Sequence, residues 1–271
     1  MKLFLTEELS YSTVRIECEL QSGEMAYGTG FFVAFKDASV PVVITNKHVI
    51  KDSKRGTLIF TKADANNEPL DKDHFNFYIS SFESYWRLHP DPNVDLCAMS
   101  LSLFFNSAAQ QHVKLFYKFI PMSLIPNSAQ LQELSALEDI IMIGYPNALW
   151  DEVNNKPLFR KGVTATHPAF DFNGQKEFMI DAACFPGSSG SPVFLFKEGV
   201  TMNRGGGATL NPGPQCLLLG VLYAGPQQSV TGEIQVVNVP TSQVPVPVSS
   251  IPMNLGFVIK SERIKELEAL F

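Results

Sequence analysis

Short runs of β-branched and aromatic residues, separated by clusters of glycine, proline, asparagine and aspartate, recur along most of the chain. Such runs predict β-strands, and a long series of them with mainly turn-forming residues between predicts a β-sandwich or a β-barrel. The runs are STVRIECEL, GTGFFVAF, VPVVITNKHVI, GTLIFTKA, HFNFYISS, DLCAMSLS, DIIMIGYP, EFMIDAAC, SPVFLF, CLLLGVLYAG and LGFVIK. This pattern predicts an all-β protein.

Helical periodicity is confined to two short segments. Residues 128–137 (SAQLQELSAL) predict one helix, and residues 261–271 (SERIKELEALF) predict another, in which Ile264 and Leu267 can share one face. Residues 116–137 are poor in strand pattern and are expected to link two β-rich halves. The chain has 271 residues and is 45% hydrophobic, which is enough for one large core or two smaller ones.

The composition argues against several classes of partner. The formal net charge is -6, and no run of lysine or arginine offers a surface for nucleic acid, so nucleic acid is not expected as a partner. No apolar stretch approaches the roughly 18 residues of a membrane helix. The start MKLFLTEELSYS has too few apolar residues for a secretory signal. We therefore expect a cytoplasmic protein without a membrane partner.

The four cysteines, Cys18, Cys97, Cys184 and Cys216, are scattered and form no CxxC pair. Their spacing argues against a zinc site and against a framework of disulfides. Free cysteines of this kind are usually small, buried and apolar. Because the sequence has no other constellation of metal-ligating residues, neither a metal nor a cofactor is expected.

A glycine and serine cluster lies within the stretch DAACFPGSSGSPVF, which runs from Asp181 to Phe194. Such a cluster is by default a turn, because glycine adopts positive backbone dihedrals and serine caps nearby amides. A serine hydroxyl becomes an effective nucleophile only beside a base that a third group orients. The interpretation of this stretch therefore depends on a histidine and a carboxylate elsewhere in the chain.

His48 is the best candidate for the base among the five histidines. It follows the strand-like run VPVVIT and the polar residues TNK, so it is expected at the rim of a sheet, where a base can reach a cleft. Asp95 opens the run DLCAMSLS, where a carboxylate is costly to bury without a partner and a histidine would suit it. Alternatively, Asp95 caps a turn. The other histidines, which are expected to be ordinary surface or partly buried residues, are His74, His89, His112 and His167.

In this order, His48, Asp95 and Ser189 resemble the catalytic residues of the trypsin-like (chymotrypsin-fold) serine peptidases. The blocks that carry the resemblance are GTGFF, ITNKHV, VDLCAM and DAACFPGSSGSPV, followed by GVLYAG and LGFVIK. They are most similar to the HtrA or DegP group, and SGSPVF also resembles the bacterial glutamyl endopeptidases. The resemblance implies one peptidase unit over residues 1–271. This unit has two six-stranded antiparallel β-barrels, at 10–115 and 138–260, a linker at 116–137 and a short C-terminal helix at 261–271.

The resemblance also implies a role for each residue of the site. Ser189 would attack a peptide carbonyl, His48 would take its proton, and Asp95 would orient the imidazole. The backbone N–H groups of Gly187 and Ser189 would form the oxyanion hole. Ser188 occupies the variable position of the motif and is not expected to be the nucleophile.

The family's substrate pocket corresponds to residues that carry no charge in this chain. A desolvated neutral pocket penalises charged side chains, so a small or medium apolar residue is expected before the cleaved bond. The pocket residues are Ala183, Cys184, Leu222, Tyr223 and Gly225.

The sequence departs from two features of the family. Ser188 stands where digestive-type members carry an aspartate that pairs with a newly cut N-terminus, so activation by that ion pair is not expected. HtrA proteins usually carry a PDZ domain after the protease unit, and none is expected here. Control would then come from the loops at 201–215 and 226–254, or from a regulatory partner protein.

The leading hypothesis is an intracellular, bacterial serine endopeptidase that cleaves a protein or peptide substrate. The alternative is a trypsin-like protein-binding module that is non-catalytic, or that is latent until a loop or partner moves. The order His, Asp, Ser and the lack of alternating helices argue against an esterase of the α/β-hydrolase fold.

Overall fold

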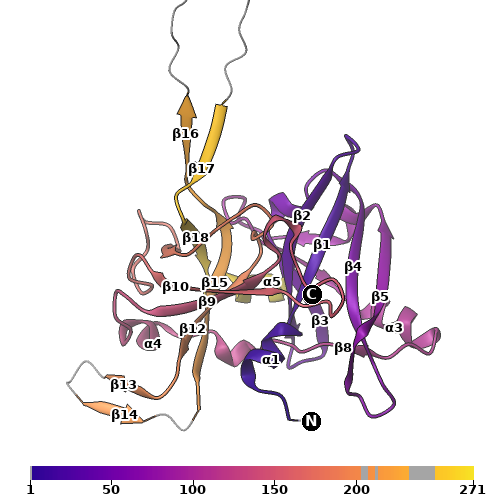
Figure 1. Ribbon diagram of the computed structural model, residues 1–271, viewed down its shortest axis with the longest axis horizontal. Helices are drawn as coiled ribbons and strands as arrows, with labels where there is room; N and C mark the ends of the chain where they lie inside the picture. Colours follow the sequence, from indigo (N-terminus) through magenta and orange to yellow (C-terminus); the bar gives the residue numbers. More distant parts are fainter. Residues whose placement is uncertain (1, 203–206, 211–212, 232–247) are drawn as a thin grey trace, which may run out of the picture.

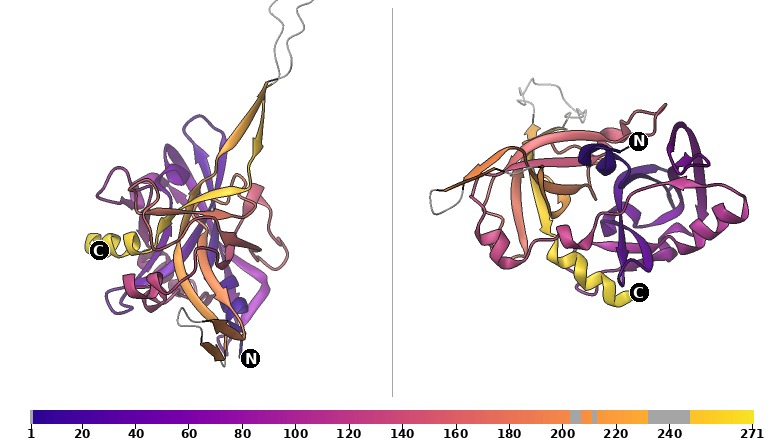
Figure 2. Two further views of the ribbon diagram at one scale, coloured as in Figure 1. Left: turned by 90° about the vertical axis from the view of Figure 1, so that its left-hand side faces the viewer. Right: turned by 90° about the horizontal axis from the view of Figure 1, so that it is seen from below.

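The computed structural model describes residues 2–202, 207–210, 213–231 and 248–271. Two β-sheets, one from each half of the chain, lie side by side (Figure 1). The last helix runs along one side of their junction, as the right-hand view in Figure 2 shows. The predicted all-β double-barrel fold with a short C-terminal helix is confirmed. The division of the chain at 116–137 stays a prediction.

The N-terminal sheet has eight strands in the order β5-β4-β1-β2-β3-β7-β6, with β8 paired to β4. Residues 28–33 of β2 are all buried, because one face of the strand points into the N-terminal core and the other meets the C-terminal half. The strands are β1 (Thr13–Leu20), β2 (Met25–Phe35), β3 (Val40–Thr45), β4 (Ser53–Ala63), β5 (Pro69–Ser80), β6 (Trp86–Leu88), β7 (Cys97–Ser100) and β8 (Leu115–Phe116).

The C-terminal sheet is a closed barrel of antiparallel strands in the order β10-β11-β18-β15-β12-β9. Closure leaves no open sheet edge in this barrel. Its strands are β9 (Asp139–Gly144), β10 (Leu158–Thr164), β11 (Glu177–Asp181), β12 (Pro192–Lys197), β15 (Gln215–Ala224) and β18 (Leu255–Lys260).

Two hairpins extend outward from the C-terminal barrel (Figure 1). One consists of β13 (Val200–Met202) and β14 (Ala208–Leu210), and the other of β16 (Gln227–Thr231) and β17 (Val248–Pro252). Proline cannot donate to a central ladder, which fits the position of Pro252 in β17, outside the barrel. The remaining parts of the two predicted gating loops, residues 203–206, 211–212 and 232–247, lie outside the described residues.

The helices are short, and three of them lie in segments that the sequence analysis had not assigned to helix. These are α1, α2 and α3, and α3 packs Phe104, Phe105 and Ala108 against the N-terminal core. The α-helices are α1 (Leu5–Ser10), α2 (Lys47–Ile50), α3 (Ser102–Gln110), α4 (Ser128–Gln132) and α5 (Glu262–Leu267). The 3₁₀ turns are η1 (Phe82–Tyr85), η2 (Met122–Leu124), η3 (Pro146–Ala148) and η4 (Glu268–Leu270). Within the described ranges, no helix has the length and apolar character needed to cross a membrane.

One hydrophobic cluster is shared by both halves of the molecule and by the last helix. The N-terminal half contributes Phe31, Val33 and Ile44, and the C-terminal half contributes Phe194 and Ile259. Two further clusters fill the interiors of the separate halves. Because the shared cluster buries side chains from both sheets and from α5, we expect the halves to unfold together.

Replacing Phe194, which is fully buried in the shared cluster, tests this expectation. We expect Phe194→Ala to lower the free energy of unfolding by about 3–5 kcal/mol, the usual cost of deleting a buried aromatic ring. Unfolding in urea, followed by tryptophan fluorescence and by circular dichroism, should remain a single transition. The control Leu103→Ala removes an exposed side chain and should change the free energy by less than about 0.5 kcal/mol. Two separate transitions, or an equal loss in the control, would contradict a shared core.

Candidate active site

His48 and Asp95 form a hydrogen-bonded pair in the N-terminal half. His48 lies in α2, which begins directly after β3, and Asp95 precedes β7, which pairs with β3. His48 Nδ1 lies 2.5 Å from Asp95 Oδ2, and the backbone N–H of His48 donates to Asp95 Oδ1 at 3.1 Å. A proton on Nδ1 therefore faces the carboxylate and leaves Nε2 with a free lone pair. This arrangement equips Nε2 to accept a proton.

The side chain of Asn46 holds the backbone of Asp95 in place. Asn46, which is fully buried, donates from Nδ2 to the backbone carbonyl of Asp95 at 2.7 Å. The side chains of His48 and Asp95 remain 47% and 24% exposed. The pair is thus held by its neighbours and still opens to solvent.

Ser189 lies on the turn between β11 and β12, which is held against β2 of the other half. The N–H of Thr29 donates to the carbonyl of Ser189 at 2.9 Å. The next residue, Gly190, has φ +86°, and a Cβ there would lie 1.9 Å from the carbonyl oxygen of Thr29. Only glycine fits this close approach, because it has no Cβ and tolerates positive φ. The glycine after the serine thus lets the turn touch β2.

The residues before Ser189 form a β-turn with a defined peptide orientation. The N–H of Ser188 donates to the carbonyl of Phe185 at 3.0 Å, and Gly187 has φ +85°, as the third residue of a type II turn requires. The carbonyl of Pro186 accepts a hydrogen bond of 2.5 Å from the N–H of Asn147. Because a trans peptide places its C=O and N–H on opposite sides, the N–H of Gly187 points away from Asn147.

The hydroxyl of Ser189 lies beside a cavity of about 250 Å³. Four of the predicted pocket residues, Cys184, Leu222, Tyr223 and Gly225, line this cavity together with Ser189. Ala183 does not line it, and its carbonyl instead accepts a hydrogen bond from Arg160 Nη1 at 2.9 Å. The cavity is also lined by four residues that the sequence analysis did not assign to the pocket, Phe185, Pro186, Ala224 and Pro226.

The structure connects Ser189 to the His48–Asp95 pair through backbone contacts. Ser189 Oγ lies 3.5 Å from the carbonyl of Tyr223, and among the residues described no hydrogen bond joins it to His48. The link runs through Thr29, whose N–H binds the Ser189 carbonyl and whose own carbonyl accepts from Thr45 Oγ1 at 2.7 Å. Thr45 ends β3, three residues before His48. The GTGFF block thus positions the serine turn, a role that the sequence analysis did not assign to Thr29.

The polar groups around the cavity are neutral or paired. Tyr223 donates from its hydroxyl to Glu177 Oε2 at 2.9 Å, and burial together with this carboxylate raises the pKa of Tyr223. Burial raises the pKa of the Cys184 thiol to about 11, although nearby Arg160 partly opposes the shift. In the part of the chain that the structure describes, no group of three or more His, Cys, Asp or Glu residues could hold a metal ion.

The raised pKa of Cys184 predicts a slow reaction with thiol reagents. At pH 8 only about 10⁻³ of this thiol would be ionised, so alkylation by iodoacetamide should be slow and should accelerate about tenfold per pH unit up to pH 10. Time courses of intact mass for wild type and Cys184→Ser provide the measurement. Rapid alkylation of Cys184 at pH 7 would show that the thiol is not buried as described.

Several solved structures and one family profile are similar to this chain. No curated protein matches the sequence significantly. Similar solved structures include the HtrA-type protease AlgW with a tripeptide (14% identity, TM-score 0.46, covering 95% of this chain and 58% of that one). Another is the Rv3671c protease from M. tuberculosis in its active form (14% identity, TM-score 0.47, covering 97% of this chain and 82% of that one). A third is the serine endoprotease from Yersinia pestis (14% identity, TM-score 0.47, covering 98% of this chain and 64% of that one).

The chain therefore spans about 60% of the length of the AlgW structures that it matches. The family profile described as trypsin-like peptidase domain matches residues 28–201, which is more than half of the chain. The matched segment contains β2 from Gly28 onward, both members of the His48–Asp95 pair and the turn that carries Ser189. This protein belongs to the trypsin-like peptidase domain family.

Proposed function

We propose that this protein is a serine endopeptidase that hydrolyses peptide bonds through an acyl-enzyme. The observation that carries the proposal is the hydrogen bond from His48 Nδ1 to Asp95, which leaves Nε2 free to act as a base. The turn of Ser189 is held against β2 of the same half that carries this pair. The family membership of the chain supports the same reaction class.

In the proposed reaction, Ser189 Oγ attacks the carbonyl carbon of the peptide bond and gives its proton to His48 Nε2. Asp95 stabilises the imidazolium that results. The tetrahedral intermediate then collapses, the bond to nitrogen breaks, and His48 returns the proton to the leaving amine. Water, deprotonated by His48, cleaves the acyl-enzyme in the same way and releases the acid. A rotation of the Ser189 side chain from Tyr223 toward His48 precedes the attack.

The oxyanion of each tetrahedral intermediate is assigned to the N–H groups of Gly187 and Ser189. The hydrogen bond from Asn147 to the carbonyl of Pro186 supports this role, because it turns the Gly187 N–H to the opposite side of the peptide. A fixed donor of this kind typically contributes about 10²–10³ in rate. The carbonyl of Gly187 also accepts from Thr29 Oγ1 at 3.1 Å, which further fixes this residue.

The cavity beside Ser189 suits a small or medium apolar side chain before the cleaved bond. Its volume is about 250 Å³, and Cys184 and Leu222 supply an apolar surface. A charged substrate side chain would lose its hydration there without gaining an ionic partner. We therefore propose proteins or peptides with an apolar residue at this position as substrates. Control by a regulatory partner, and gating by the loops at 201–215 and 226–254, stay predictions.

Substitution of the three proposed catalytic residues tests the mechanism. Ser189→Ala and His48→Ala should lower kcat by about 10⁴-fold or more, and Asp95→Asn by about 10⁴-fold, because the three groups act as a unit. A fluorophosphonate probe, followed by intact mass, should label the wild type and fail to label Ser189→Ala. Ser188→Ala, which removes the neighbouring hydroxyl, is the matched control and should keep both labelling and turnover. A folded wild type that is neither labelled nor active would favour the alternative, a non-catalytic or latent binding module.

Peptide libraries test the proposed specificity. Wild type should prefer Ala, Val or Leu before the cleaved bond over Lys or Asp by at least about 10²-fold in kcat/KM. Cys184→Ala enlarges the cavity and should raise the ratio of kcat/KM for Phe over Ala by roughly tenfold, the lower end of what one methylene group contributes in an apolar pocket. A preference for Lys or Asp, or an unchanged ratio in Cys184→Ala, would exclude this cavity as the specificity pocket.

A further inference from the structure

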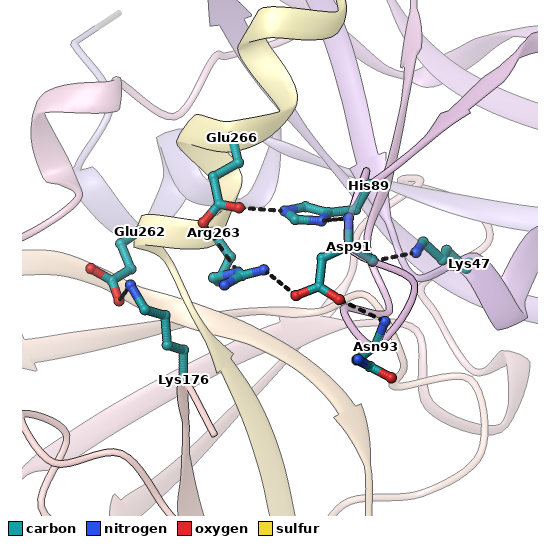
Figure 3. A network of polar contacts seen from close by, with 8 residues as sticks. All are labelled: Lys47, His89, Asp91, Asn93, Lys176, Glu262, Arg263 and Glu266. Carbon is teal, nitrogen blue, oxygen red and sulfur yellow. Dashed lines mark hydrogen bonds and ion pairs between the residues drawn. The ribbon is translucent and has the colours of Figure 1, made fainter. Parts of the chain in front are cut away.

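The last helix, α5, makes a set of polar contacts with the loop that leads to Asp95 (Figure 3). Arg263 Nη2 lies 2.9 Å from Asp91 Oδ2, and Glu266 Oε2 lies 3.3 Å from His89 Nε2. Arg263 Nε and Glu266 Oε1, 3.2 Å apart, connect these two contacts on the helix. Two side chains of α5 therefore reach two residues of the segment between β6 and β7.

Asp91 and His89 also make hydrogen bonds within the same loop. Asp91 Oδ1 accepts from the N–H of Asn93 at 2.9 Å, and the N–H of Asp91 donates to His89 Nδ1 at 3.1 Å. The N–H of His89 donates to the carbonyl of Leu96, the residue after Asp95, at 2.9 Å. The loop is thus closed on itself between His89 and Leu96, the segment that contains Asp95.

Lys47 extends this network to the neighbour of the catalytic base. Its Nζ donates to the carbonyl of Asp91 at 2.9 Å (Figure 3). Burial lowers the pKa of Lys47, although the nearby Asp95 and Asp91 oppose the shift. Lys47 precedes His48 in α2, so the turn at Asp91 contacts the segments of both members of the His48–Asp95 pair.

His89 is the buried member of this network, and its charged members are electrostatically complementary. His89 is 3% exposed, and burial lowers its pKa, which favours a neutral ring whose Nδ1 accepts from Asp91. The hydrogen bond from Asn93 and the guanidinium of Arg263 lower the pKa of Asp91 and favour its charged form. The sequence analysis expected an ordinary histidine at position 89. In the structure His89 is buried beneath the loop and contacts both the N–H of Asp91 and the carboxylate of Glu266.

We infer that α5 is a positioning element for the catalytic pair, in which Arg263 holds the turn at Asp91 and thereby fixes Asp95 and His48. Arg263 acts through Asp91 and touches no reacting atom, so it is a positioning residue. The inference rests on the proposed function for its kinetic consequence. Its structural consequence, the order of the His48–Asp95 hydrogen bond, can be measured without turnover.

The position of α5 itself does not depend on Arg263. Ile264 and Leu267 are fully buried in the shared cluster, and Phe271 packs against Phe35 at 5.9 Å between ring centroids. Glu268 also accepts a hydrogen bond from the N–H of Lys36 at 2.5 Å. A substitution at Arg263 should therefore leave the helix docked and release only the loop.

The experiment compares four variants of the full chain. Arg263→Ala removes the contact with Asp91, and Asp91→Asn keeps an acceptor for the Asn93 N–H but removes the charge. Arg263→Lys is the conservative rescue. Glu262→Ala is the matched control, because Glu262 lies on the same helix as Arg263. This substitution breaks the 2.9 Å ion pair between Glu262 and Lys176 and leaves the contacts of Asp91 in place (Figure 3). Thermal unfolding of each variant shows whether it is folded at the assay temperature.

The first measurement is the low-field proton resonance of His48 Nδ1–H in histidine labelled with ¹⁵N. We expect this resonance in wild type, Glu262→Ala and Arg263→Lys, and we expect exchange to broaden it beyond detection in Arg263→Ala and Asp91→Asn. Its absence from wild type, or its persistence in both of the last two variants, would overturn the inference. Loss of the resonance in Glu262→Ala as well would also overturn it, because general loosening of the helix would then explain the result.

The second measurement is steady-state kinetics on an apolar peptide substrate. Arg263→Ala and Asp91→Asn should lower kcat by roughly tenfold to a hundredfold with KM nearly unchanged, because displacing a catalytic group by about 1 Å costs up to about 10²-fold. Arg263→Lys should recover part of the loss, and Glu262→Ala should match wild type. Equal kcat in wild type and Arg263→Ala would refute the positioning role while the proposed function stands. An inactive wild type that passes the resonance test would refute the proposed function alone.

Discussion

The proposed chemistry depends on keeping one hydrogen bond that is open to solvent, between His48 and Asp95, in a single geometry. The two side chains are 47% and 24% exposed, and a hydrogen bond between exposed side chains contributes little stability of its own, because water competes for both partners and side-chain entropy opposes the contact. The order of the pair must therefore come from its surroundings. Asp95 is bound through its carboxylate by the His48 backbone and through its carbonyl by Asn46, while the loop before it is held by Asp91.

The second half of the site depends on close contact between the two sheets. Gly190 allows the serine turn to meet Thr29 at a distance that a Cβ would not permit, and Gly190 also donates to the carbonyl of Leu222 at 2.8 Å. The apolar cluster shared by the two halves holds them at this separation. The shared cluster therefore keeps the two parts of the candidate site in a fixed relative position. The helix α5 packs into the same cluster through Ile264 and Leu267.

The sequence was sufficient for the fold class and for the order of the candidate residues, because strand-forming runs and turn residues are local signals. It predicted α5 from periodicity, and it located His48 and Asp95 at strand ends. It missed α3, whose sequence SLFFNSAAQ reads as a continuation of the strand before it and has no side-chain cap. It placed Ala183 in the pocket, whereas the carbonyl of that residue binds Arg160 and the residue does not line the cavity. The roles of Asn147 and His89 arise from contacts between residues far apart in the chain, which local pattern does not encode.

The most direct test of the account is a crystal structure of the protein after reaction with a peptidyl boronate that carries an apolar residue next to boron. The account predicts a bond between boron and Ser189 Oγ, with one boronate oxygen bound by the N–H groups of Gly187 and Ser189 and His48 Nε2 within hydrogen-bond distance of the adduct. The apolar side chain should occupy the cavity lined by Cys184 and Leu222. A folded protein that forms no adduct, or an adduct at Ser188 or Cys184, would contradict the account.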